Sequence, residues 1–170
     1  MELVKGNKLT SFVDLFNESK VIVSKEIKEN MLKMFSSQQI LEAKLLYVAS
    51  LHNFSTQKFH ELCENIPHTL TLCQTEHGKI IGGYTPLVWG KSNNYLRDES
   101  GESFIFSLTN NHKFTVDKSN VAIYQHISEG PYFGDSHPDL YISSNANTCA
   151  RSWSKINRSY SNENYMIDSE

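Results

Sequence analysis

The sequence predicts an α+β protein that is mainly β, folded as a two-sheet antiparallel β-sandwich flanked by short helices. Short apolar stretches recur between residues 45 and 143, and turn-forming residues separate them about every ten positions. This spacing is typical of sandwiches, whose strands are short and joined by turns. A chain of 170 residues has the size of one domain. We expect an N-terminal helical extension over 1–23 and the main domain over 24–170.

The N-terminal part of the chain predicts two short helices. Between residues 10 and 19, Phe12, Leu15 and Phe16 fall on one helical face. Ser24 is a suitable N-cap for the second helix. The apolar stripe of that helix consists of Ile27, Met31, Met34 and Phe35. Both helices are short, so their stability must come from packing against the sheets.

The next segment predicts strands on either side of a third helix. We expect a strand over Lys44–Ser50, followed by a helix that begins after an N-cap at Ser55. A strand over Thr69–Glu76 and a returning strand over Lys79–Thr85 are then joined by a hairpin turn at His77-Gly78.

The rest of the predicted sandwich follows from apolar alternation. Gly82-Gly83 inside a strand indicates a bulge or the close approach of another backbone or ring. Residues 91–103 are polar and predict a surface loop or a long hairpin tip, before the clearest strand at Phe104–Leu108. Further strands are expected over Phe114–Val116, Val121–His126 and Leu140–Ser143. The predicted core is made of Leu46, Leu72, Ile81, Tyr84, Trp89, Phe104, Phe106, Ile123, Phe133 and Leu140.

Several linked motifs in this region resemble one known family. They are Gly82-Gly83-Tyr84 followed by Trp89, Phe104-Ile105-Phe106-Ser107-Leu108, Gly130-Pro131-Tyr132-Phe133-Gly134, and Asp139-Leu140-Tyr141-Ile142. From about Ser24 to Ser161 the chain resembles a TLDc domain, the module of the oxidation-resistance protein family. The resemblance implies a two-sheet sandwich with helices at its ends and a non-enzymatic interaction module. It also implies a role in oxidative-stress protection and contact with the vacuolar ATPase, and it supplies no catalytic residue or cofactor.

The chain departs from the family pattern at its C-terminal end. TLDc domains normally close with a strand that ends in an acidic-apolar-aromatic run. Only Tyr165-Met166-Ile167-Asp168 could form it here. The sequence therefore predicts that the final strand is either degenerate or absent, and an absent strand would leave a sheet edge exposed.

Charge and cysteine content favour an intracellular protein. The formal net charge is −3, which gives no global field that would attract nucleic acid. The start of the chain lacks the apolar core of a signal peptide, and no stretch has the length of a membrane span. We expect a cytoplasmic protein, with the nucleus as the second possibility, and no disulfide among its three thiols.

A metal site is the first chemical possibility in the sequence. Side chains of the types that bind zinc occur at His60, Cys63, Cys73 and His77, but their spacing matches no known zinc finger. The favoured interpretation is that the two cysteines belong to the core and the two histidines lie on the surface, so we expect no metal. Cys149 is the thiol with the most basic neighbours, which leaves a hydrolase or redox enzyme as a weak third hypothesis.

Two further residue sets are candidates for binding. Surface loops on a rigid scaffold are the usual place for contact specificity. The protein-partner candidates lie in the 91–103 and 130–138 segments and are Arg97, Tyr132, Asp135 and His137. The alternative is a nucleic-acid-binding regulator that uses the basic-aromatic 151–160 segment. Its candidate residues are Arg151, Trp153, Lys155 and Arg158.

Overall fold

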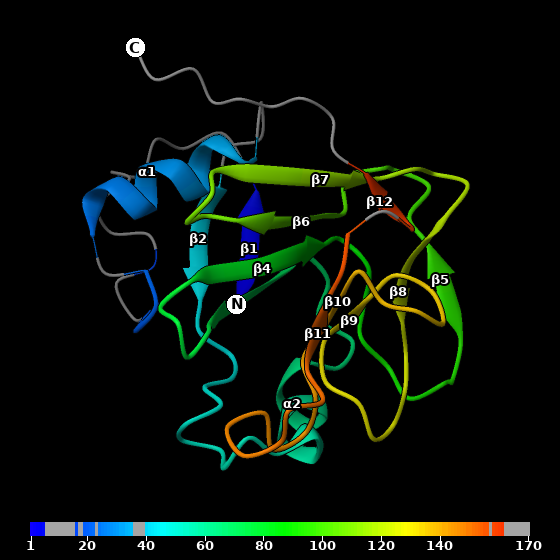
Figure 1. Ribbon diagram of the computed structural model, residues 1–170. Coiled ribbons are helices and arrows are strands. Elements are labelled where there is room, and N and C mark those ends of the chain that lie inside the picture. Colours follow the sequence, from blue (N-terminus) through cyan, green and yellow to red (C-terminus); the bar gives the residue numbers. More distant parts are fainter. Residues whose placement is uncertain (6–15, 17–18, 23, 36–39, 157, 162–170) are drawn as a thin grey trace.

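The computed structural model describes residues 1–5, 16, 19–22, 24–35, 40–156 and 158–161. They form one seven-stranded sheet, one five-stranded sheet and two short helices (Figure 1). All of the strand pairs are antiparallel. The predicted α+β, mainly β sandwich with flanking helices is therefore confirmed. No helix in the described residues is long and apolar enough to cross a membrane.

The larger sheet has the strand order β12-β7-β6-β4-β3-β1-β2. Its strands in chain order are β1 (Glu2–Lys5), β2 (Ile40–Lys44), β3 (Thr69–Gln74), β4 (Ile80–Thr85), β6 (Phe104–Ser107), β7 (His112–Val116) and β12 (Tyr160–Ser161). The smaller sheet has the order β11-β10-β9-β8-β5. Its strands are β5 (Tyr95–Arg97), β8 (Val121–Tyr124), β9 (Tyr132–Phe133), β10 (Leu140–Tyr141) and β11 (Trp153–Ser154).

The seven-stranded sheet is covered by apolar side chains on both faces. Side-chain alternation along β6 sends Phe104 and Phe106 to one cluster and Ile105 to the other. The first cluster includes Met31 of helix α1 (Lys25–Lys33). The second lies between the two sheets. Its buried members are Phe59, Cys63, Trp89, Ile105, Val116, Ala122, Ile123, Phe133, Leu140 and Tyr160. The domain thus has two cores on the two faces of one sheet.

The predicted core residues divide between these two clusters. Seven of them are buried: Tyr84, Trp89, Phe104, Phe106, Ile123, Phe133 and Leu140. The other three, Leu46, Leu72 and Ile81, are half-buried and pack against the clusters. These three side chains lie at the margins of the clusters. Alternation alone cannot distinguish a fully buried position from a half-buried one on the same face.

Both predicted helix starts are confirmed in the described residues. The hydroxyl of Ser24 accepts a hydrogen bond from the Ile27 amide at 3.2 Å and caps α1. The hydroxyl of Ser55 accepts from the Lys58 amide at 3.3 Å and caps helix α2 (Thr56–Cys63). The helix predicted over residues 10–19 lies almost wholly outside the described residues, as does the final strand at 165–168.

Three strand predictions need correction or addition. Residues 45–50 form no strand, because β2 ends at Lys44 and the Val48 carbonyl accepts from Leu51 and His52 in a local turn. The 91–103 segment is not only a loop, because it contains β5, which pairs with β8. Strand β1 was not predicted inside the 1–23 extension, and it pairs with β2 and β3. The 23/24 boundary itself stays a prediction.

The glycine pair of β4 lies where rings approach the sheet closely. A Cβ on Gly82 would lie 2.6 Å from the Phe106 ring, and a Cβ on Gly83 would lie 2.6 Å from the Phe133 ring. Phe133 is itself held by Trp89 and Tyr160, with ring centroids 5.5 Å and 6.3 Å away. The predicted close approach is confirmed, and it brings the second sheet onto β4.

Replacing Gly83 by Ala should therefore lower the free energy of unfolding by about 1–3 kcal/mol, the usual cost of overpacking a core. Urea denaturation would measure the change. Gly78→Asn is the matched control, since nothing lies within 4 Å of a Cβ there and Asn tolerates the positive φ of +72°. Equal stability of Gly83→Ala and the unmodified protein would contradict this packing.

Candidate interaction site

The outer face of the five-stranded sheet carries one aromatic residue from each strand. Tyr141 pairs with Trp153 on one side and with Tyr132 on the other. Tyr95 pairs with Tyr124. Ile123, which precedes Tyr124, pairs with Phe133, which follows Tyr132, so Tyr124 and Tyr132 lie on adjacent strands. In spatial order the five are Trp153, Tyr141, Tyr132, Tyr124 and Tyr95, and we call them the aromatic row.

Alternation along the strands explains why the row faces outward. Ile123, Phe133 and Leu140 precede or follow row residues in their strands and are buried between the sheets. Their neighbours must therefore point to the opposite face. Trp153 and Tyr95, at the two ends of the row, keep 53% and 47% of their surface exposed.

The four tyrosine rings of the row contact one another across the strands. Tyr95 and Tyr124 are stacked with centroids 4.4 Å apart, and Tyr124 meets Tyr132 edge to face at 5.2 Å. Tyr132 and Tyr141 are tilted at 5.2 Å. Because ring contacts of this kind restrict side-chain rotation, the four tyrosines form a preorganised surface.

A groove of about 410 Å³ runs beside one end of the row. Its lining combines Tyr132, Tyr141 and Trp153 with residues from the 130–138 and 151–160 segments. The lining is completed by Glu129, Ser136, His137, Pro138, Lys155 and Arg158. The structure thus brings together Tyr132 and His137 from the predicted protein-partner set and Trp153, Lys155 and Arg158 from the predicted nucleic-acid set.

Other candidate residues lie outside the groove lining. Arg97 is exposed on β5, near the far end of the row. The Asp135 carboxylate accepts from the His137 amide at 2.9 Å and so shapes the loop beside the groove. Arg151 is exposed and close enough to Tyr141 to lower the pKa of its hydroxyl, although other causes raise that pKa overall.

The cationic side of the groove is fixed by a buried carboxylate. Asp139 is fully buried, and its two oxygens accept from the amides of Arg158 at 3.1 Å and Ser159 at 2.9 Å. Its backbone carbonyl accepts from the Lys155 amide at 3.1 Å. These bonds hold the chain after β11 against β10. The side chains of Lys155 and Arg158 remain exposed.

The hydroxyls of Tyr132 and Tyr141, in the middle of the row, lie near carboxylates. Burial, followed by Tyr95 and Asp135, raises the pKa of Tyr132 to about 12. Burial and the hydrogen bond that it donates to Glu129 also raise the pKa of Tyr141. Both hydroxyls therefore stay protonated at neutral pH and act as hydrogen-bond donors.

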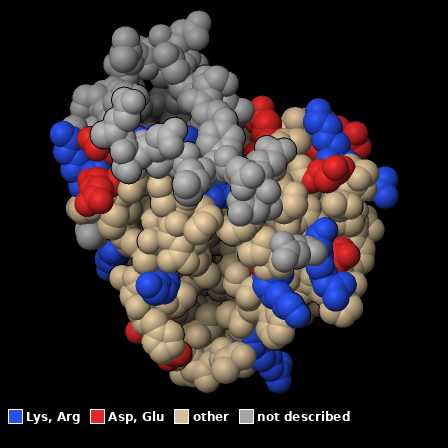
Figure 2. Space-filling view, turned by 45° about the horizontal axis from the view of Figure 1, so that its top comes forward, with Lys and Arg blue, Asp and Glu red and all other residues tan. Residues whose placement is uncertain are grey.

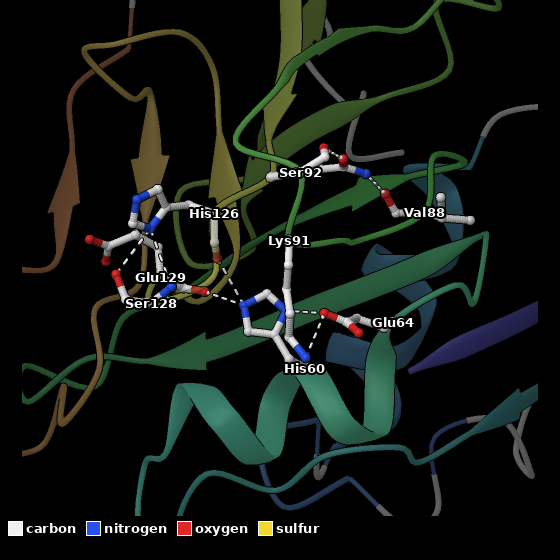
Figure 3. A network of polar contacts seen from close by, with 9 residues as sticks. His60, Glu64, Val88, Lys91, Ser92, His126, Ser128 and Glu129 are labelled. Atoms are coloured by element: carbon white, nitrogen blue, oxygen red, sulfur yellow. Dashed lines mark hydrogen bonds and ion pairs between the residues drawn. The ribbon is translucent and has the colours of Figure 1, made fainter.

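A polar network behind the groove anchors Glu129 to helix α2. The Nε2 atom of His60 lies 2.9 Å from the His126 carbonyl and 3.1 Å from the Glu129 carbonyl, so this nitrogen donates (Figure 3). Its Nδ1 lies 3.0 Å from Glu64, which Lys91 also contacts at 3.2 Å. The expectation that His60 is a surface histidine is wrong, because it is buried and links α2 to the 126–129 segment.

The thiols are placed differently from the binding residues. Burial raises the pKa of Cys63 to about 11 and also raises that of Cys73, so both are protonated at neutral pH. These side chains line a second, mainly apolar cavity of about 310 Å³. His77 is an exposed hairpin residue, as predicted. The described residues contain no group of three or more potential metal ligands.

Sequence reasoning missed three members of the row. Tyr124 and Tyr141 each follow a predicted core residue in a predicted strand, so alternation could have placed both on the outer face. Tyr95 gave no such signal, because it lies in a polar segment without periodicity.

Comparison with known proteins agrees with this architecture. The model of the family described as TLDc domain matches residues 16–170. No curated protein matches the chain. The matched range includes both helices, the groove and every strand except β1. The chain therefore belongs to the TLDc domain family.

Proposed function

We propose that this TLDc domain is a non-enzymatic protein-interaction module, with a role in oxidative-stress protection and vacuolar ATPase regulation. The observation that supports it best is the partly exposed aromatic row beside a groove with cations at its rim. Tyr, Trp and Arg are the residues that most often dominate binding energy at protein interfaces. In a monomer such a row exposes apolar area that a partner can cover.

Partner recovery from native cells tests this proposal. Arg97→Glu and His137→Ala should each abolish co-purification of vacuolar ATPase subunits or of an oxidative-stress factor. Both side chains are exposed, so their replacement should change the free energy of unfolding by no more than about 0.5 kcal/mol. Mass spectrometry of the recovered proteins and thermal denaturation give the two readouts.

The matched control is Lys79→Glu, at the exposed hairpin between β3 and β4 on the other sheet. It should recover the same partners as the unmodified protein. If the two loop variants also do so, the interaction-module proposal fails.

Nucleic-acid binding is the second candidate function. It is favoured by the position of Trp153, Lys155 and Arg158 in one groove, since aromatic rings stack on bases and cations bind phosphates. Figure 2 shows positive and negative side chains interspersed on the face drawn, which does not favour a long polyanion. Salt-dependent retention on immobilised DNA that is lost on joint replacement of Arg151, Lys155 and Arg158 would establish this second function.

A further inference from the structure

The aromatic row presents hydrogen-bond donors that have no acceptor in the described part of the protein. The indole N–H of Trp153 and the hydroxyl of Tyr132 both belong to this group. Lys155 and Arg158, at the same end of the row, form no ion pair with any described carboxylate. A ligand of this surface should therefore supply backbone carbonyls along the row and negative charge at one end.

The spacing of the row matches a polyproline II helix. Neighbouring strands lie about 4.8 Å apart, so every second aromatic recurs at roughly 9.6 Å. A polyproline II helix repeats every three residues and rises about 3.1 Å per residue, which gives roughly 9.3 Å. Prolines three positions apart can thus meet Trp153 and Tyr132 in turn. The carbonyls of such a helix have no internal partners, so they can accept from the row.

The charge distribution favours a peptide over a nucleic acid. Glu129 lines the groove and accepts from Tyr141, and Asp135 is close enough to Tyr132 to help raise the pKa of its hydroxyl. A phosphate backbone along the row would pass these two carboxylates. A peptide can be uncharged there and carry its acidic residues only opposite Lys155 and Arg158.

We propose that the aromatic row and its groove bind a proline-rich segment in the polyproline II conformation, with acidic residues at the end that meets Lys155 and Arg158. This partner class rests on the proposed function as an interaction module. Aromatic-lined grooves recognise such segments at low entropic cost, because the ligand is already extended before it binds.

The test uses the full chain and a fluorescently labelled hexaproline that ends in two aspartates. Fluorescence anisotropy should show saturable binding. The emission of Trp153 should shift to the blue, since the only other Trp of the chain, Trp89, is buried. Trp153→Ala and the double change Lys155→Glu with Arg158→Glu should each weaken binding at least about tenfold. All three side chains are exposed, so far-UV circular dichroism should be unchanged.

Matched probes and variants separate the outcomes. The control variant Lys44→Glu with Lys79→Glu reverses two exposed charges on the other sheet and should bind like the unmodified protein. A glycine-serine peptide with the same aspartates should not bind. Tighter binding of a short oligothymidylate than of the proline peptide would overturn the proposal in favour of nucleic acid.

The partner class and the proposed function can fail separately. No binding of the proline peptide, together with loss of cellular partners in Arg97→Glu and His137→Ala, overturns only the partner class. Unchanged partner recovery in those variants overturns the proposed function, whichever peptide binds.

Discussion

Truncation of Phe106 to Ala should lower the free energy of unfolding by about 3–5 kcal/mol, the usual cost of removing a buried aromatic ring. Phe106 is only 3% exposed and lies in the cluster beneath α1, with its ring centroid 6.0 Å from that of Phe104. Its ring also covers the glycine at position 82, where a Cβ would lie 2.6 Å away. The surrounding sheet backbone cannot close the cavity that truncation would leave.

Urea denaturation followed by circular dichroism measures this loss, and the expected value is a large part of the total stability of an ordinary domain. Phe114→Ala is the matched control, because Phe114 is half-buried on the neighbouring strand β7. Its truncation should cost clearly less. A loss below about 1 kcal/mol for Phe106→Ala would contradict its place in the core.

Local signals in the sequence predicted those parts of the fold that depend on neighbouring residues. Ser24 and Ser55 cap helices through bonds to amides three positions ahead, so both helix starts could be read directly. The β3–β4 hairpin closes through the Thr75 amide and the Lys79 carbonyl at 2.9 Å, around the predicted His77-Gly78 turn. Alternation placed Phe104 and Phe106 on one face of β6 for the same local reason.

Features that depend on distant pairing could not be predicted in this way. Strand β5 exists because Tyr95 and Leu96 pair with β8, and no periodicity in its own polar segment indicates a strand. His60 is buried through contacts with carbonyls 66 and 69 positions away. The aromatic row requires the register of five strands, so only its individual members could be anticipated.

The C-terminal segment is a further case of long-range structure. The sequence pattern fades after Ser143, yet Tyr160 is fully buried and its hydroxyl donates to the Ala122 carbonyl at 2.7 Å. Strand β12 pairs with β7 at the edge of the larger sheet. A second acceptor that connects this segment to the smaller sheet is Asp139, which precedes β10. One carboxylate thus links the fold of the chain end to the cationic rim of the groove.

Replacing Asp139 by Ala should therefore lower the free energy of unfolding by about 2–6 kcal/mol, since two backbone amides lose their acceptors at roughly 1–3 kcal/mol each. Asp139→Asn keeps one acceptor oxygen and should lose less. Asp117→Ala is the matched control, because Asp117 accepts from the amide and hydroxyl of Ser119 at an exposed turn. Its loss should be about 1 kcal/mol or less.

The same Asp139→Ala variant should also weaken the groove under conditions where the domain remains folded. Arg158 and Ser159 are released, whereas Lys155 keeps its bond to the backbone carbonyl of residue 139. Because Arg158 then loses its fixed position at the groove, binding of the acidic proline peptide should fall by about tenfold or more. Anisotropy measured well below the denaturation midpoint tests this, with Asp117→Ala binding normally. Full peptide affinity in Asp139→Ala would show that the rim does not depend on this carboxylate, because nothing else in the variant differs at the groove.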